Sequence, residues 1–243
     1  MSSTVNRPQR QRTEISTKSP LGRIRKPLLA CGIAASLMYA VMMLVIRYPG
    51  YSAMSQTVSE LSAWGISTRP LWIVLGSLYD ALMIAFGLGV WASAGGKRSL
   101  RIVGSLLVAY GLLGVAWPFA AMHQREVLAA GGGTLADTGH LVLGGITVGL
   151  MFAAMAFGAA AFGMWFRIYS IATILVLLAF GALTAADAPR VAADLPTPLA
   201  GFWERINIGV FLLWVVVLAT VLLRNQPMNS SSNSPRHLVS TAS

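Results

Sequence analysis

Six stretches of apolar residues, each about long enough to cross a lipid bilayer, are the feature that most restricts how this chain can fold. They lie at about 28–46, 71–94, 102–122, 140–164, 168–186 and 206–223. A helix of roughly 20 apolar residues spans the hydrocarbon core. Backbone groups in lipid must be hydrogen-bonded within the protein, and the runs lack the strand-length alternation of a barrel. The sequence therefore predicts an all-α bundle of six transmembrane helices.

Composition supports a membrane environment and defines the flanks of the bundle. Charged residues make up only 11% of the chain and hydrophobic residues 56%, too few charges to cover a water-facing surface. The first run is too long for the apolar part of a signal peptide and lacks a small-x-small cleavage site, so we interpret it as a true span. The polar segments 1–27 and 224–243 are predicted to be disordered cytoplasmic tails around a membrane domain at 28–223.

The distribution of basic residues predicts the orientation of the chain. An even number of spans places both tails on one side. That side holds Arg7, Arg10, Arg12, Lys18, Arg23, Arg25, Lys26, Lys97, Arg98, Arg101, Arg167, Arg224 and Arg236; the other holds Arg47, Arg69, Arg125, Arg190 and Arg205. Because loops rich in positive charge stay in the cytoplasm, we expect a plasma-membrane protein with both termini on the cytoplasmic side. This asymmetry accounts for the net charge of +10 without a nucleic-acid partner. The single cysteine, Cys31, excludes an intramolecular disulfide.

The long connections at 47–70, 123–139 and 187–205 all lie on the predicted outer side, so chemistry or recognition is expected there. Between Tyr51 and Trp64, apolar residues and serines fall on opposite faces at helical spacing, which predicts an amphipathic interfacial helix capped by Ser52. One interpretation is a cover anchored by Trp64. The other makes Ser55 and Glu60 part of an outward-facing site.

The fourth run is rich in small residues, including Gly144, Gly145 and Gly149. Small residues three and four positions apart let helix backbones approach closely, so this span is predicted to be the central packing element. The alternative is a seam between two copies of the chain in a homo-oligomer.

Two short motifs carry a family resemblance. Residues 55–65, Ser-Gln-Thr-Val-Ser-Glu-Leu-Ser-Ala-Trp-Gly, are followed by Arg69-Pro70, and residues 204–214 read Glu-Arg-Ile-Asn-Ile-Gly-Val-Phe-Leu-Leu-Trp. Together with the six-span region they resemble the domain of unknown function 998 family. The resemblance implies a polytopic membrane protein without an assigned reaction, and it transfers no catalytic residue.

His123, Asp137 and His140 form a candidate metal site. Asp137 and His140 share a helix face, and His123 precedes them at the end of the third run, with Glu60 or Glu126 available as a fourth ligand. Zinc held there could activate water. Alternatively, Asp137 caps a helix and the histidines serve as hydrogen-bonding groups. The spacing is loosely similar to membrane hydrolases of the alkaline ceramidase type, but the chain lacks their paired His-x-x-x-His.

Asp80 lies near the middle of the second span, roughly 15 Å from its outer end. A charge at that depth costs several kcal/mol, and no basic residue lies at matching depth. We predict that Asp80 is neutral or hydrogen-bonded to Tyr39 or Tyr110; the alternatives are a proton relay and a polar substrate site. Glu204 and Arg205 are predicted to join the outer loops or bind a ligand, pairing with Arg69 or with Asp187 and Asp194.

The sequence thus predicts an integral membrane protein of unassigned activity, with the lipid bilayer as its certain partner. Its outward-facing polar cluster would bind a small molecule, a lipid or a protein partner. The cluster comprises Ser55, Glu60, Arg69, His123, Asp137, His140, Glu204 and Arg205. The alternatives are a metal-dependent membrane lipid hydrolase and a proton-linked carrier built around Asp80. We lean against an enzyme because the sequence contains no phosphate-binding loop and no nucleophile elbow.

Overall fold

The computed structural model describes residues 20–224, and within that range it contains helices and no strand. The long helices are α1 (Pro20–Val45), α2 (Arg69–Ala92), α3 (Arg98–Gly114), α5 (Leu135–Ala159), α6 (Met164–Ala192) and α7 (Ala200–Arg224). The short elements are the 3-10 helices η1 (Ser59–Ser62) and η2 (Trp117–Phe119) and the helix α4 (Arg125–Ala129). Six helices are long and apolar enough to cross a membrane. The predicted all-α, six-span architecture is confirmed.

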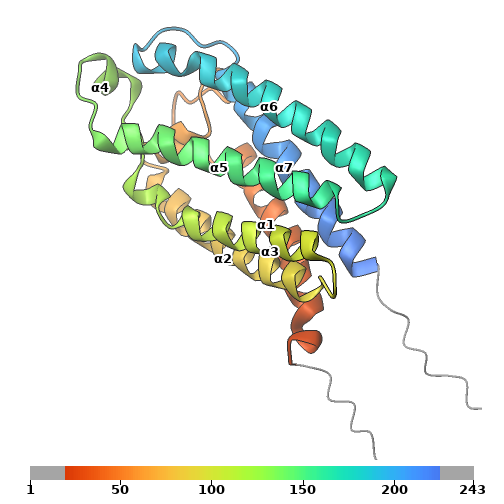
Figure 1. The fold of residues 1–243 in the computed structure, drawn as a ribbon. Helices are drawn as coiled ribbons and strands as arrows, with labels where there is room; N and C mark the ends of the chain where they lie inside the picture. The colour runs from red at the N-terminus through yellow and green to blue at the C-terminus, as the bar shows by residue number, and fades with distance from the viewer. Residues whose placement is uncertain (1–19, 225–243) are drawn as a thin grey trace, which may run out of the picture.

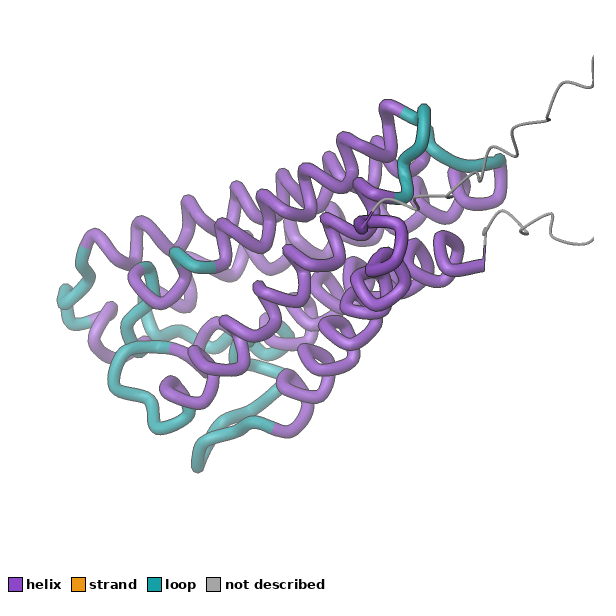
Figure 2. Tube along the Cα trace, turned by 90° about the horizontal axis from the view of Figure 1, so that it is seen from below, coloured by secondary structure: helices purple, strands orange, loops and turns teal. Residues whose placement is uncertain are grey.

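The long helices lie side by side in one elongated bundle (Figure 1), and the chain enters α1 and leaves α7 at the same end. The opposite end carries the three longer connections, residues 46–68, 115–134 and 193–199, which together we call the cap. Figure 2 shows most of the non-helical chain gathered at that end. The turns at the other end, 93–97 and 160–163, are short. An even number of spans therefore places both described ends opposite the cap.

Neighbouring helices close the bundle into a ring. α1 packs against α2 and α7, α2 against α3, α3 against α5, α5 against α6, and α6 against α7. The most deeply buried large side chains include Phe211, Trp214 and Leu218 of α7. Met83, Phe86 and Val90 of α2 are equally buried, so α2 and α7 together supply much of the core.

Glycines allow close packing between α2 and α3. The sequence had predicted such packing for the fourth run, which is α5. A Cβ added at Gly104 would lie 2.7 Å from the backbone nitrogen of Trp91, so only glycine fits that position. On α5, by contrast, Gly144, Gly145 and Gly149 have no heavy atom within 4 Å of the place a Cβ would take. The prediction that this span is the central packing element was wrong, because these three glycines face away from neighbouring helices and, of the predicted glycines on α5, Gly158 alone packs closely, against Trp214 of α7.

Several boundaries differ from those predicted; α3, for example, ends at Gly114 and not near 122, and α7 begins at Ala200 and not near 206. α1 begins at Pro20, so residues 20–27, assigned to a disordered tail, are helical. Proline is favoured in the first turn of a helix, and Arg25 donates to Ser93 Oγ (3.4 Å), which attaches this basic segment to the end of α2. At the cap end, α6 continues to Ala192 and shortens the last connection to 193–199. The rest of the predicted tails, 1–19 and 225–243, lies outside the described residues.

The interfacial helix predicted between Tyr51 and Trp64 is absent; that segment holds only the single turn η1. Its polar side chains bond to nearby backbone instead. The Ser52 amide donates to Gln56 Oε1 (2.8 Å) and the Thr57 amide donates to Glu60 Oε1 (2.8 Å). Such local bonds offer the backbone an alternative to helix hydrogen bonds. The spacing of apolar residues was helical, but these bonds fold the segment into turns.

Candidate functional site

Glu60 and Arg125 form the centre of the cap. Glu60 is only 3% exposed and lies in η1. Its carboxylate accepts two bonds from Arg125, one from Nε and one from Nη2, each 2.8 Å long. Gln56 Nε2 (3.2 Å) and Thr57 Oγ1 (3.0 Å) donate to the same carboxylate. A paired arrangement of this kind is the strongest form of ion pair that a protein makes.

Arg125 also ties together the three segments of the cap. Its Nη1 donates to Thr197 Oγ1 (2.9 Å), and its Nη2 donates to the carbonyl oxygen of Ser55 (3.1 Å). Thr197 Oγ1 donates to that carbonyl as well (2.8 Å). One guanidinium from segment 115–134 therefore connects segment 46–68 with segment 193–199. Ser55 takes part through its carbonyl, not through the hydroxyl that the sequence singled out.

Glu204 and Arg205, at the start of α7, bind the same loop from below. Glu204 accepts from the backbone amide of Val58 and from Ser59 Oγ (3.0 Å). Arg205 donates to the carbonyl oxygens of Ala53 (2.8 Å), Gln56 (3.2 Å) and Gly201 (2.9 Å), and to the hydroxyl of Tyr51 (2.6 Å). The predicted joining of loops is present, but with other partners. Within residues 20–224, neither side chain pairs with Arg69, Asp187 or Asp194.

Burial and pairing shift the acidity of the cap groups outside the membrane spans. The hydrogen bonds that Arg125 donates to the Glu60 carboxylate raise the pKa of Arg125, so this guanidinium stays charged. Burial raises the pKa of Tyr51 to about 12, despite the opposing effect of Arg205. Arg125 therefore stays charged and Tyr51 stays neutral over the physiological range.

Arg69 is a separate anchor at the start of α2. It donates to the carbonyl oxygens of Ser62 (2.6 Å) and Pro118 (2.8 Å), and its guanidinium lies 3.9 Å from the centre of the Trp64 ring. These contacts hold segment 46–68 against segment 115–134. Arg69 does not contact the Glu60 carboxylate.

The three candidate metal ligands are placed differently from one another. His123 Nδ1 lies 2.9 Å from Asp137 Oδ2, and the His123 amide donates to Asp137 Oδ1 (2.7 Å). Asp137 also accepts from the Thr134 amide (2.7 Å), completing a capping box at the start of α5. His140 turns its Nδ1 to the carbonyl oxygen of Ala120 (3.0 Å). In the described part of the chain, no three His, Cys, Asp or Glu side chains are grouped to hold a metal ion.

A polar pocket of about 230 Å³ opens beside the central pair. Its walls come from segments 46–68 and 115–134. They are formed by Tyr48, Pro49, Gly50, Gln56, Glu60, Ala63, Ile66, Gln124, Arg125 and Glu126. Gln56 is held in place because its Nε2 donates to the Tyr48 hydroxyl (2.8 Å), and Gln124 because its Nε2 donates to the Trp64 carbonyl (3.0 Å). Gln56, Glu60, Gln124 and Arg125, four of the polar side chains in the lining, are thus held in place by hydrogen bonds.

Asp80 does not make the predicted hydrogen bonds. The hydroxyl of Tyr110 is paired with that of Tyr79 (2.9 Å), and Tyr39 packs against the Tyr79 ring at 4.7 Å between centroids. The carboxyl of Asp80 is half-buried and fills the space that a side chain at position 114, a glycine, would need. Within residues 20–224 it has no hydrogen-bond partner and no salt bridge.

The family to which the chain belongs is shown by a match that covers nearly all of the membrane region. Comparison with protein-family models matches residues 29–221 to the family described as a protein of unknown function (DUF998). This chain belongs to the DUF998 family. The searches of curated proteins and of solved structures gave no significant match. The family resemblance predicted from the sequence is therefore confirmed.

The two motifs that first suggested DUF998 meet in the cap. Residues 55–65 contribute Glu60, and residues 204–214 contribute Glu204 and Arg205, which bind that same loop. What the sequence missed in this DUF998 protein is Arg125, which entered only the charge count. The sequence shows a single arginine between residues 115 and 134, but its pairing with Glu60, 65 residues away, is visible only in the structure.

Proposed function

We propose that this DUF998 protein binds a small polar ligand carrying an amino or quaternary ammonium group in the cap pocket. The observation that carries the proposal is the pocket itself, a polar hollow next to a buried and fully paired carboxylate. Small-molecule sites are typically concave and contain a few fixed polar groups that orient the ligand. Gln56 and Gln124, each held by a neighbour, supply such groups here.

The charge of the lining favours a cation over an anion. Two glutamates and one arginine line the pocket, and Arg125 is already paired with Glu60. Glu126 is exposed and makes no salt bridge within residues 20–224. An uncompensated carboxylate at the wall of a partly enclosed pocket attracts a positive group.

We further propose that the cap faces outward from a plasma membrane and that both chain ends face the cytoplasm. The support is the excess of basic residues on the side of the tails. With Cys31 replaced, cysteines introduced at Gly96 and Ala192 report the two ends of the bundle. An impermeant thiol reagent applied to intact cells is expected to label position 192 alone. Labelling at position 96 alone would reverse the orientation.

Ligand binding is tested with phosphoethanolamine as a soluble probe and glycerol phosphate as the probe without an amine. Saturating probe should raise the midpoint of thermal unfolding, because ligand at about 100 times its Kd adds about 2.7 kcal/mol to stability. The midpoint should rise with phosphoethanolamine concentration until it saturates. In Glu126→Gln the apparent affinity obtained from this titration should fall at least tenfold. The matched control is Asp187→Asn, a carboxylate outside the pocket lining. Equal responses to both probes, or none, would refute the proposal.

A further inference from the structure

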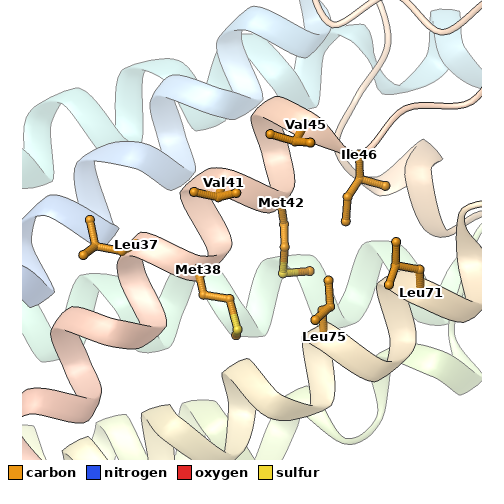
Figure 3. A pocket seen from close by; sticks show the side chains of 8 residues that line it. All are labelled: Leu37, Met38, Val41, Met42, Val45, Ile46, Leu71 and Leu75. Atoms are coloured by element: carbon orange, nitrogen blue, oxygen red, sulfur yellow. The ribbon is translucent and has the colours of Figure 1, made fainter.

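A second hollow lies below the cap, between α1 and α2, and its lining is wholly apolar. It measures about 420 Å³ and is lined by Leu37, Met38, Val41, Met42, Val45, Ile46, Leu71 and Leu75. Figure 3 shows Met38 and Met42 extending from α1 toward the side of Leu71 and Leu75 on α2. Both helices are membrane spans by length and composition. This groove therefore lies where hydrocarbon, not water, is the surrounding solvent.

The lining suits a flexible alkyl chain. Leu37, Val41 and Val45 are more than half exposed (61%, 57% and 70%), so the groove is open along one side. Two of the lining residues are methionines, whose unbranched, polarisable side chains adapt to irregular apolar partners. A chain lying in such a groove gains dispersion contacts that it lacks in fluid lipid.

The cap end of the groove leads toward the polar pocket along both of its walls. On the α1 side, Ile46 lines the groove and Tyr48 lines the pocket. On the α2 side, Leu71 lines the groove and Ile66 lines the pocket. In the sequence, one residue separates the groove lining from the pocket lining on the first side, and four residues separate them on the second.

Arg47 lies in the chain between the last groove residue and the first pocket residue. It is exposed, and it uses Nε and Nη2 to bond the carbonyl oxygen of Leu44 (3.3 and 3.1 Å). A guanidinium has five N–H donors, so Nη1 retains two for an anion such as phosphate. From groove to pocket, the order is thus an apolar surface, a cation, and a cluster with surplus negative charge at Glu126.

A zwitterionic phospholipid has matching groups in the same order, namely an alkyl chain, a negative phosphate and a positive ammonium. We propose that the groove and the cap pocket together bind one membrane phospholipid with an amine-bearing headgroup. Its acyl chain lies along the groove, its phosphate meets Arg47, and its ammonium enters the pocket beside Glu126. This inference rests on the proposed function, and it identifies the ligand of that pocket as a constituent of the bilayer.

The test uses the full chain in nanodiscs of equal parts phosphatidylethanolamine and phosphatidylglycerol, followed by native mass spectrometry of the released protein. The wild type is expected to retain one phosphatidylethanolamine. Val41→Trp fills the groove and should reduce retention at least tenfold. Leu44→Trp is the matched control, an exposed residue of the same helix outside the groove lining. Leu71→Trp fills the groove from α2 and should reduce retention as well. It provides a second test if Val41→Trp fails to fold.

The outcomes separate this inference from the proposal on which it rests. Arg47→Gln and Glu126→Gln should each lower retention of phosphatidylethanolamine, while Val41→Trp should leave the thermal response to soluble phosphoethanolamine intact. Equal retention in Val41→Trp and Leu44→Trp, with that response preserved, would overturn the groove and leave the pocket standing. Loss of the soluble response in the wild type would overturn both. Preferred retention of phosphatidylglycerol, or a dimer that covers the groove, would also overturn the inference.

Discussion

Glu60 and Asp80 are both acidic side chains that are at least partly withdrawn from water, but the fold supplies hydrogen-bond partners only to Glu60. Glu60 accepts bonds from Gln56, Thr57 and Arg125. Asp80 makes no hydrogen bond within residues 20–224 and packs against Gly114. The difference follows from their backbones: amides in the cap segment are free to turn toward a side chain, whereas amides in the middle of α2 are already bonded along the helix. A carboxylate in a loop can therefore accept bonds from backbone amides that a carboxylate in the middle of a helix cannot reach.

The largest effect should come from removing the central carboxylate of the cap. Glu60→Ala leaves Arg125 buried without its partner, and breaking a buried pair on one side costs about 3–5 kcal/mol. Thermal or denaturant unfolding in detergent measures the loss. Glu126→Ala, at an exposed neighbour without a salt bridge, is the control and should change stability by about 0.5 kcal/mol or less. A loss below about 1 kcal/mol for Glu60→Ala would mean that the pair does not hold the cap.

A smaller effect is expected at Asp137, in the first turn of α5 next to the cap. Asp137→Ala removes the capping box of α5 and its bonds to His123, which should cost about 1–2 kcal/mol. The same variant separates capping from the zinc site predicted from the sequence. Added zinc that stabilises the wild type but not Asp137→Ala would favour a metal site. An equal loss with and without zinc would favour capping alone.

The smallest effect is expected at Asp80. Asp80→Asn keeps the size of the side chain and removes no hydrogen bond of the described structure, so stability should change by about 0.5 kcal/mol or less. Unfolding of matched samples checks this. A loss of stability above about 1 kcal/mol would show that Asp80 has an interaction partner, which would contradict the contrast drawn with Glu60. If Asp80 relays protons, the variant should fold normally yet lose any pH-dependent transport, because an amide cannot ionise.

The span architecture followed from sequence because it depends on a local property, the length of apolar runs. The cap did not, because its partners are far apart in the chain: Arg125 and Glu60 are 65 residues apart. Helical spacing between Tyr51 and Trp64 was misleading, since local side-chain bonds override a periodic pattern. Likewise, Gly144 and Gly149 look like packing residues in the sequence, and only the direction of α5 shows that they face away.

The candidate site was predicted in outline and corrected in detail. Glu60, Glu204 and Arg205 do gather in the cap, as expected from acids on the long connections. Arg205, however, bonds to carbonyl oxygens, and His140 turns to one as well. Whether a backbone carbonyl in a loop is free to accept such a bond depends on the shape of the loop, and no sequence pattern predicts that.

The central claim is that paired and hydrogen-bonded carboxylates give the cap its fixed shape. Backbone amide exchange at Thr57 and Val58 tests it most directly, because these amides donate to Glu60 and Glu204 and not to any helix carbonyl. Exchange should be slow at both positions in the wild type, fast at Thr57 in Glu60→Ala, and fast at Val58 in Glu204→Ala. Exchange at the rate of an unprotected loop in the wild type would contradict the account.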